Sequence, residues 1–429
     1  MEIYVVKPGD SVYKIANQFG VSEESILLNN GLASSVQLVP GQTLVILYPQ
    51  QTYTVQPGQT LEAVAAAAGV SVNQLLRNNP VLKGKSTIYP GQTLVISYTQ
   101  PKEGTLAVNG YTYTNIDRDI LRRTLPYLTY MTVFTYGFKP TGELIIPDDE
   151  EIVALAHEYG VAPVMLISTL TDQGGFSNEL SSLLLNDEQL QDKVIDNILV
   201  NMKAKNYAGL DIDFEYVYPE EREKYVAFVE KATKRLNDEG YFVIVALAPK
   251  TNAEQKGLLY EAHDYKGLGA AANYVLLMTY EWGFSQGPPM AVAPIFKVDE
   301  VLKYAVTEIP REKIFMGMPN YGYDWTLPFI KGVTKAPSIG NLQAVELAQK
   351  VGATIQYDEK SQAPFFNYYD ENWKEHEVWF EDARSVRAKL NLANSYQLNG
   401  VSYWNLMRFF PQNWLVLNSL YNIEKLNVK

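Results

Sequence analysis

The residues best suited to chemistry lie near the middle of the chain, in the segment Gly209–Tyr216, which reads G-L-D-I-D-F-E-Y. Residues two apart on a β-strand point to the same side, so Asp211, Asp213 and Glu215 share one face and apolar side chains the other. If the strand is buried, three carboxylates about 6–7 Å apart cannot all stay ionised cheaply, and at least one should have a raised pKa. Such a carboxyl group can deliver a proton near neutral pH. The alternative is a solvated acidic face on an edge strand, or acids paired with Lys and Arg inside a barrel.

The elements that must position these acids are apolar β-rich runs that alternate with helical patterns after residue 104. Eight runs are candidate strands: Leu106–Tyr113, Tyr130–Tyr136, Ala162–Ser168, Gly209–Tyr216, Phe242–Ala248, Tyr274–Tyr280, Ile314–Pro319 and Val401–Asn405. The helices between them include Asp149–Tyr159, Asp187–Lys205, Glu221–Glu239, Val298–Glu308 and Asp382–Tyr396. This alternation predicts an α/β fold, a parallel (β/α)₈ TIM barrel, whose active site opens at the C-terminal ends of the strands. Glu215 is therefore the predicted proton donor, with Asp213 one step deeper.

The barrel region is longer than a minimal barrel by one insertion, which we predict at about residues 321–380, before the helix that precedes the last strand. We expect it to form a small α+β unit that walls one side of the cleft. Its aromatic residues include Tyr357, Phe365, Phe366, Tyr368, Tyr369, Trp373 and Trp379. We expect most of these rings to be core, because aromatic side chains are usually buried.

The first hundred residues are an internal repeat. The run Tyr4–Ser11 returns as Tyr53–Thr60, and Val39–Ile46 returns as Tyr89–Ile96. Each copy predicts the order strand, helix, helix, strand, with Ser11 and Thr60 as N-caps of the first helices. The chain thus divides into two small βααβ modules, at 1–48 and 51–98, and a catalytic domain at 104–429.

The composition and net charge argue against several classes of ligand and of chemistry. The net charge of −12 argues against nucleic acid and anionic membranes as partners, because both require basic patches. There are no cysteines and only three scattered histidines, so we expect no metal site and no cofactor. The N-terminus shows no basic region followed by an apolar core, so no signal peptide or membrane span is predicted, and synthesis in the cytoplasm is expected.

The central acids resemble the D-G-x-D-x-D-x-E signature of glycoside hydrolase family 18, with Ala208 at the position of the family's first Asp. Three later motifs strengthen the resemblance. The run Met278–Glu281 resembles the family's M-x-Y-D, with Glu281 in place of Asp; Gly317–Gly322 resembles G-x-P-x-Y-G; and Val401–Trp404 matches the last strand.

The resemblance implies a substrate-assisted reaction with retained configuration. Glu215 protonates the glycosidic oxygen, the substrate's own 2-acetamido oxygen attacks the anomeric carbon, and Asp213 orients the acetamido group. Asp211 shares a proton behind Asp213, Tyr280 donates its hydroxyl to the acetamido oxygen, and Trp404 packs against the reacting sugar. Further substrate contacts are expected from Met278, Glu281, Asn320 and Tyr321.

Both repeats resemble LysM modules, which bind glycans that contain N-acetylglucosamine, such as peptidoglycan and chitin. The implied sugar-binding residues are Gly9, Asp10, Ser11, Asn30 and Gly31 in the first copy, and Gly58, Gln59, Thr60, Asn79 and Pro80 in the second. The alternative is a spacer or a protein-interaction repeat.

Two LysM modules before a family 18 barrel resemble glycosidases that degrade cortex peptidoglycan in germinating spores of endospore-forming bacteria. We therefore expect a monomeric N-acetyl-β-D-glucosaminidase that acts on cortex peptidoglycan fragments, made in the mother cell and deposited in the coat or cortex region of the spore. Two alternatives stay open, a chitinase and a non-catalytic glycan-binding coat lectin. Endo and exo action are both compatible with the motifs.

Overall fold

Eight parallel strands close into a barrel in the computed structural model, which describes residues 1–33, 37–171 and 173–426. They are β5 (Gly104–Tyr113), β6 (Tyr130–Phe138), β8 (Ala162–Ser168), β9 (Gly209–Asp213), β10 (Phe242–Leu247), β11 (Tyr274–Leu277), β12 (Ile314–Pro319) and β18 (Gly400–Trp404). Each strand pairs with the next, and β5 pairs with both β18 and β6, which closes the ring. The predicted TIM barrel is confirmed. Strand β9 ends at Asp213, so Glu215 lies just beyond the strand rather than within it.

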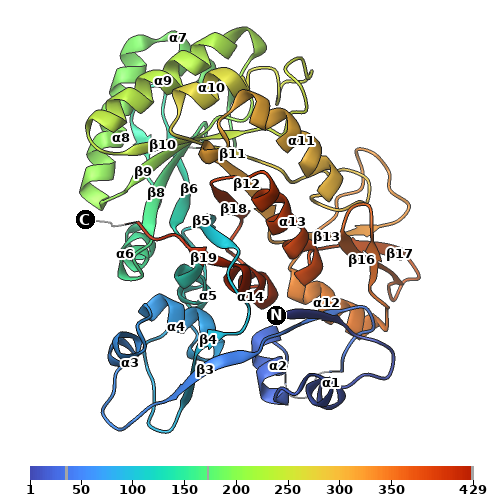
Figure 1. Cartoon of the computed structure of the whole chain (residues 1–429). Coiled ribbons are helices and arrows are strands. Elements are labelled where there is room, and N and C mark those ends of the chain that lie inside the picture. The colour runs from blue at the N-terminus through green and yellow to red at the C-terminus, as the bar shows by residue number, and fades with distance from the viewer. Residues whose placement is uncertain (34–36, 172, 427–429) are drawn as a thin grey trace.

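Helices surround the strands (Figure 1). They are α5 (Arg118–Thr124), α6 (Glu150–Glu158), α7 (Asn178–Asn186), α8 (Glu188–Lys205), α9 (Arg222–Asp238), α10 (Tyr265–Ala271), α11 (Ile295–Glu308), α13 (Ala383–Ser395) and α14 (Pro411–Leu420). Helix α9 shows why these segments fold onto the barrel, since Phe228, Val229, Ala232 and Leu236 recur at helical spacing and are all buried. Short elements complete this part: β7 (Leu144–Ile145), β19 (Tyr421–Ile423), and the 3₁₀ turns η2 (Leu125–Tyr127), η3 (Pro219–Glu221) and η4 (Arg311–Lys313).

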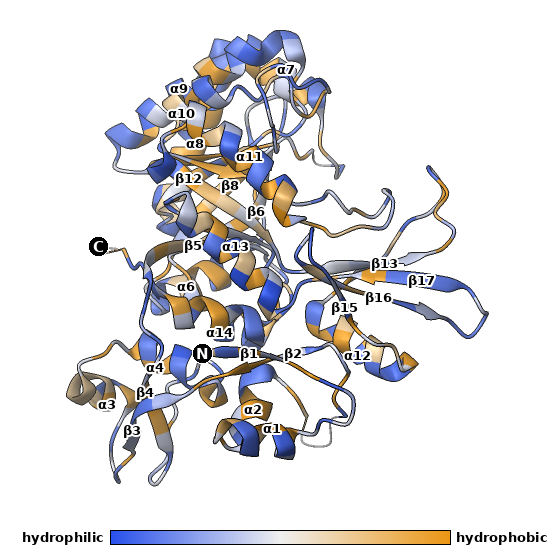
Figure 2. Cartoon of the chain, turned by 45° about the vertical axis from the view of Figure 1, so that its right-hand side comes forward, coloured by the Kyte–Doolittle hydropathy of each residue, from blue (hydrophilic) through white to orange (hydrophobic). Residues whose placement is uncertain are grey.

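The insertion between β12 and α13 is a small α+β unit, as expected. Its five strands form an antiparallel sheet in the order β14-β13-β17-β16-β15. The elements are β13 (Gly322–Thr326), β14 (Ser338–Ile339), α12 (Asn341–Val351), β15 (Gln356–Asp358), β16 (Ala363–Tyr369) and β17 (Glu375–Trp379). One face of the sheet packs Phe366 and Val378 against Ala344 and Ala348 of α12. Figure 2 shows the sheet projecting from the side of the barrel.

Each N-terminal repeat folds as the predicted strand, helix, helix, strand. The first contains β1 (Glu2–Val5), α1 (Val12–Phe19), α2 (Glu23–Asn30) and β2 (Thr43–Ile46); the second contains β3 (Pro49–Thr54), α3 (Leu61–Ala68), α4 (Val72–Asn78), the turn η1 (Pro80–Leu82) and β4 (Thr93–Tyr98). Ser11 and Thr60 are the N-caps, and their hydroxyl oxygens accept from the backbone N–H groups of Lys14 (3.3 Å) and Ala63 (3.2 Å).

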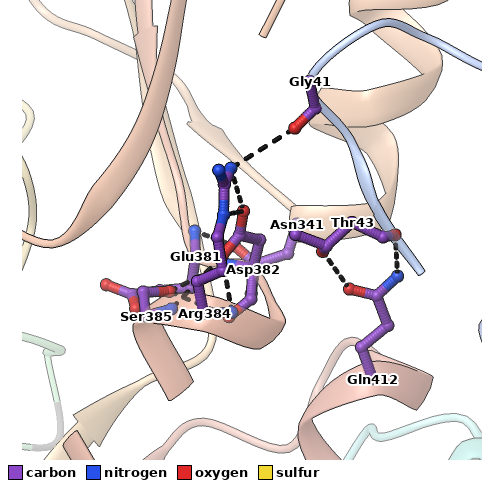
Figure 3. Close-up of polar contacts among 8 residues, drawn as sticks. All are labelled: Gly41, Thr43, Asn341, Glu381, Asp382, Arg384, Ser385 and Gln412. Carbon is purple, nitrogen blue, oxygen red and sulfur yellow. Dashed lines mark hydrogen bonds and ion pairs between the residues drawn. The ribbon is translucent and has the colours of Figure 1, made fainter. Parts of the chain in front are cut away.

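Both modules rest on one helix of the barrel, α14, whose ten residues are all buried. At one end, Gln412 donates to the carbonyl oxygen of Thr43 (2.6 Å) and accepts from the Thr43 hydroxyl (2.7 Å) (Figure 3). At the other end, Asn418 donates to Asn78 Oδ1 (3.0 Å) and accepts from Arg77 Nε (3.0 Å). The modules are therefore held on the barrel by buried polar contacts rather than only by the linker.

A second contact helps to hold the first module on the barrel. Arg384 of α13 binds the carboxylate of Asp382 at 2.7 Å and donates to the carbonyl oxygen of Gly41 at 3.3 Å (Figure 3).

Among the described residues, no helix combines the length and apolar character that crossing a membrane requires.

Candidate active site

A cavity of about 230 Å³ opens at the C-terminal ends of the barrel strands. Its lining residues are Tyr111, Asp213, Glu215, Ala246, Pro249, Leu259, Tyr260, Leu276, Met278, Tyr280, Glu281, Trp282 and Trp404. Six of the residues predicted from the sequence, namely Asp213, Glu215, Met278, Tyr280, Glu281 and Trp404, thus come together at one place. The motifs are far apart along the chain, and the closed barrel is what gathers them.

The acidic row points into the barrel. Asp211 is fully buried, and its Oδ2 accepts a hydrogen bond from the Tyr111 hydroxyl at 2.5 Å. Oδ1 of Asp211 and Oδ1 of Asp213 have no hydrogen-bond partner among the described residues. Burial raises the pKa of Asp211 to about 7, while the bond from Tyr111 opposes that rise. Asp211 is therefore poised to hold or release a proton near neutral pH.

The two outer acids have raised pKa values as well. Burial, and then the negative charges of Glu215 and Asp211, raise the pKa of Asp213 well above its usual value. Burial, and then the charge of Glu281, raise the pKa of Glu215. A carboxyl group that retains its proton in this way, at the mouth of a cavity, is suited to act as a general acid.

A buried histidine, His263, fixes the backbone between Asp213 and Glu215. Nδ1 of His263 accepts from the backbone N–H of Ala248 at 2.8 Å, so Nε2 carries the proton and donates to the carbonyl oxygen of Phe214 at 3.1 Å. Burial lowers the pKa of His263 to about 4, which keeps the ring neutral. His263 thus orients the segment that carries Asp213 and Glu215.

Two glycines allow close packing in the barrel, Gly209 at the N-terminal end of β9 and Gly317 beside the site. A Cβ atom on Gly209 would lie 2.4 Å from the ring of Phe242, so only glycine lets β9 pack there. A Cβ atom on Gly317 would lie 2.7 Å from the ring of Tyr280.

Burial and the neighbouring carboxylates raise the pKa of Tyr280 far above its usual value, so its hydroxyl stays protonated and can donate.

Trp404 is held by other aromatic rings. Its ring centroid lies 5.6 Å from that of Tyr111, 5.0 Å from that of Phe134 and 6.1 Å from that of Tyr113. These tilted and edge contacts leave Trp404 partly exposed at the cavity, where an indole can pack against a sugar.

Glu281 has a left-handed backbone conformation, with φ of 66°. Its carboxylate accepts from the hydroxyl of Tyr321, and from that of Tyr323 at 3.0 Å. Burial raises the pKa of Glu281, and the two hydroxyls oppose that rise. The amide of Asn320 donates to the carbonyl oxygens of Asn405 (3.0 Å) and Arg408 (2.8 Å) and so orders the loop after β18.

Several cavity residues were not predicted from the sequence, notably Tyr111, Tyr260 and Trp282, and neither was Tyr323, the partner of Glu281. Tyr111 could have been found, because it lies four residues after the inward-facing Ala107 on β5 and so shares its face. Tyr323 carried no such signal, since it belongs to the insertion and reaches Glu281 only through the tertiary fold.

The predicted LysM residues divide into two groups. Gly9 and Ser11 in the first module, and Gly58 and Thr60 in the second, are exposed on matching loops. Asp10 and Gln59 order those loops, accepting from the backbone N–H groups of Lys7 and Gln56, at 2.8 Å each.

The second group lies elsewhere. Asn30 is fully buried, donates to the carbonyl oxygens of Ile26 and Val45, and accepts from the Val45 N–H at 2.7 Å. Asn79 repeats this pattern in the second module. Because these amides are already satisfied inside the modules, they are not available to a glycan. A Cβ atom on Gly31 would lie 2.8 Å from Pro411, so this residue faces α14, and Pro80 begins the turn η1.

The described residues contain no group of three or more His, Cys, Asp or Glu side chains that could hold a metal ion.

Comparison with known families agrees with this geometry. The model of glycosyl hydrolases family 18 matches residues 106–408, and the LysM domain model matches residues 4–47 and 53–97. The chain belongs to glycosyl hydrolases family 18 and carries two LysM domains.

Several relatives match the chain over nearly its whole length. It is 43% identical, over 435 residues and 99% of both chains, to a cortical fragment-lytic enzyme of Bacillus subtilis (strain 168). It is 41% identical, over 433 residues and 99% of both chains, to the protein of the same name in Bacillus anthracis. The crystal structure of the Bacillus megaterium QM B1551 spore cortex-lytic enzyme SleL superposes with a TM-score of 0.84 and 42% identity, covering 99% of this chain and 98% of that one.

Proposed function

We propose that this protein is an N-acetyl-β-D-glucosaminidase that hydrolyses β-1,4 bonds after N-acetylglucosamine in spore-cortex peptidoglycan fragments during germination. The observation that carries the proposal is the row Asp211, Asp213 and Glu215, which opens into a cavity lined by Tyr280 and Trp404. The names of relatives that match the chain end to end support the substrate.

Catalysis begins with proton delivery by Glu215 to the glycosidic oxygen, because burial and the charge of Glu281 raise the pKa of this carboxyl group and so favour its protonated form. The substrate's acetamido oxygen attacks the anomeric carbon from the opposite face, so no protein nucleophile is needed. Asp213 orients the acetamido N–H and balances the positive charge that develops on the group. Tyr280 donates to the acetamido oxygen, and Trp404 packs against the sugar.

Asp211 acts behind Asp213. Its pKa is near 7 and its Oδ1 has no hydrogen-bond partner in the described part of the chain, so Asp211 can take up the proton that Asp213 must release to act on the acetamido group. Glu215, now ionised, accepts a proton from the water that opens the oxazolinium intermediate, which gives net retention. The position of the family's first Asp is occupied by Ala208, and here Tyr111 supplies the hydrogen bond to Asp211.

The LysM modules bring the enzyme to glycan, chiefly through the exposed loops Gly9–Ser11 and Gly58–Thr60. We propose that the enzyme acts as a monomer, with 1–48 and 51–98 as the modules and 104–429 as the catalytic domain, and is deposited in the coat or cortex region of the spore.

The test is mass spectrometry of the products formed from spore-cortex fragments and from chitin oligomers. The unmodified protein should release fragments that end in N-acetylglucosamine, and Glu215→Gln should lower the rate by about 10²–10⁴-fold. Glu371→Gln, at an exposed turn, is the matched control. Preferential turnover of chitin would favour a chitinase, and binding of either glycan without turnover by the unmodified protein would favour a lectin.

A further inference from the structure

The two LysM modules share one fold but differ in what surrounds the turn that enters their last strand. This closing turn is Val39–Gln42 in the first module and Tyr89–Gln92 in the second. Val6 and Val55 each exchange two backbone hydrogen bonds with the closing turn of their own module, at 2.8 and 2.9 Å. Both residues come shortly before the exposed loop of the module, so the closing turn and the exposed loop are neighbours.

The insertion covers the closing turn of the first module. Val39 is 3% exposed and belongs to the same apolar cluster as Phe366 of β16. The carbonyl oxygen of Pro40 accepts from the Ile355 N–H at 2.9 Å, and a Cβ atom on Gly41 would lie 1.8 Å from the Ile355 carbonyl oxygen. A glycan could reach this turn only by displacing the insertion.

The closing turn of the second module is open. Tyr89, which stands where the first module has Val39, is 67% exposed. A Cβ atom on Gly91 would meet no atom of the described residues within 4 Å. Val81, in the turn η1, is 47% exposed, whereas its counterpart Leu32 packs against the core of the first module. The second module thus presents two large apolar side chains to solvent where their counterparts in the first module are packed.

The cavities beside the two modules differ in the same way. The first, lined by Gln42 of the closing turn together with Leu342 and Ile355 of the insertion, has a volume of about 10 Å³, enough for one water molecule. The second has a volume of about 620 Å³, within the usual range of ligand sites. Its lining includes Glu62, just after the exposed loop, and residues 84–87, just before the closing turn, and helices α5 and α6 form the opposite wall. Of these two cavities, only the second has room for a sugar.

We infer that the second LysM module makes the main glycan contact outside the active site, whereas the first mainly joins the insertion to the barrel. The inference rests on the proposed function, because it takes a glycan with N-acetylglucosamine as the ligand. The ring of Tyr89 offers a flat surface for one face of a sugar, and the exposed Ser86 and Thr87 offer hydroxyls to its polar groups. Of the two exposed loops, only Gly58–Thr60 lies beside such an open surface.

The first test compares repeat-equivalent variants in a Glu215→Gln background, which cuts glycan too slowly to disturb a binding measurement. Asp10 and Gln59 hold the exposed loops in the same way, each accepting from a backbone N–H at 2.8 Å. Gln59→Ala and Tyr89→Ala should each raise the dissociation constant for insoluble peptidoglycan about fivefold or more, because the loop loses its support or the sugar its stacking partner. Asp10→Ala should raise it less than about twofold. Glu371→Gln, at an exposed turn, is the control.

Two results would overturn the inference. A loss of binding in Asp10→Ala as large as that in Gln59→Ala would show that the first module contributes equally. Unchanged binding in both Gln59→Ala and Tyr89→Ala would leave the open turn to a protein partner. Neither result touches the proposed function, which fails if the unmodified protein does not turn over cortex fragments.

A second test addresses the first module and needs no glycan. Val39→Ala removes part of the apolar contact with the insertion, so amide hydrogen exchange in β16 and β17 should become about threefold faster or more. Tyr89→Ala, at the equivalent position of the repeat, should leave exchange in these strands as it is. Hydrogen-exchange mass spectrometry on the full chain measures both variants. Unchanged exchange in Val39→Ala would overturn the role inferred for the first module.

Discussion

The hydroxyl of Tyr111, on the first barrel strand, lies 2.5 Å from Oδ2 of Asp211, on the fourth. This bond satisfies one oxygen of a fully buried carboxyl group and leaves Oδ1 without a partner among the described residues. Burial alone would push the proton affinity of Asp211 higher, and the bond from Tyr111 holds its pKa at about 7. The deepest acid of the row is thus kept near the pH at which it can exchange a proton with Asp213.

The first prediction concerns stability and Asp211. Its pKa of about 7 in the folded protein exceeds the usual value of 3.8, so the folded state binds the proton more tightly. The stability that this carboxyl group contributes is fully present below about pH 4 and is lost as the pH rises through 7. Asp211→Asn has no proton to lose, so it should be more stable than the unmodified protein by roughly 2–4 kcal/mol at about pH 8, with a smaller gap at about pH 5.

Urea unfolding at both pH values checks this prediction, with Asp238→Asn, on the exposed end of α9, as control. The same variant should lose most of its activity, because Asp213 loses its proton partner. An equal stability difference at the two pH values would contradict the raised pKa of Asp211.

The barrel was predictable because its strands are apolar runs separated by helical patterns. The grouping of Asp211, Asp213 and Glu215 was predictable because alternate residues of a strand share a face. The glycan-binding role expected for Asn30 and Asn79 came from their place in the LysM repeat. Sequence alone does not say that these amides are satisfied by their own module. The packing of the two LysM modules on α14 could not be predicted from the sequence either. Gln412 and Asn418 lie in a helix that is buried on all sides, so no polar face marks them as contact residues.

The second prediction addresses that docking. Gln412 hydrogen-bonds the hydroxyl and the carbonyl oxygen of Thr43, and its Nε2 donates to Asn30 Oδ1 at 3.1 Å. Gln412→Ala removes the hydrogen bonds to the buried hydroxyl and carbonyl oxygen of Thr43 and one of the two bonds to Asn30 Oδ1, which still accepts from the Val45 N–H. It should therefore lower the free energy of unfolding by about 1–3 kcal/mol. Gln349→Ala, on the exposed side of α12, is the control and should be neutral within about 0.5 kcal/mol. Urea unfolding followed by limited proteolysis of the first module measures the effect, and a neutral Gln412→Ala would show that the contact does not hold the module.

The third prediction uses a buried ion pair. Lys389 Nζ lies 2.7 Å from Glu381 Oε2, with side-chain exposures of 1% and 2%. Lys389→Met leaves a buried carboxylate unpaired and should cost about 3–5 kcal/mol of stability. The double variant Lys389→Met with Glu381→Leu removes both charges and should recover most of that loss. The comparison is made by urea unfolding, and a double variant as unstable as the single one would mean that packing, not charge, dominates at this position.

The fourth prediction concerns the pH dependence of catalysis. The charge of Glu281, after burial, raises the pKa of Glu215, so removing that charge should lower it. A general acid must be protonated to act, and kcat/KM falls on the basic side as Glu215 ionises. In Glu281→Gln this fall should therefore begin at a lower pH than in the unmodified protein. Gln can still accept from Tyr321 and Tyr323, so the shape of the site is kept.

The matched variant is Glu281→Asp, which keeps the charge but shortens the arm that reaches Tyr321 and Tyr323. Its basic limb should move less than that of Glu281→Gln, while its KM rises because the carboxylate is no longer held by two hydroxyls. Full pH profiles of kcat/KM on one cortex fragment separate these effects. If the basic limb stays in place in Glu281→Gln, the raised pKa of Glu215 comes from burial alone, and Glu281 serves only to position the substrate.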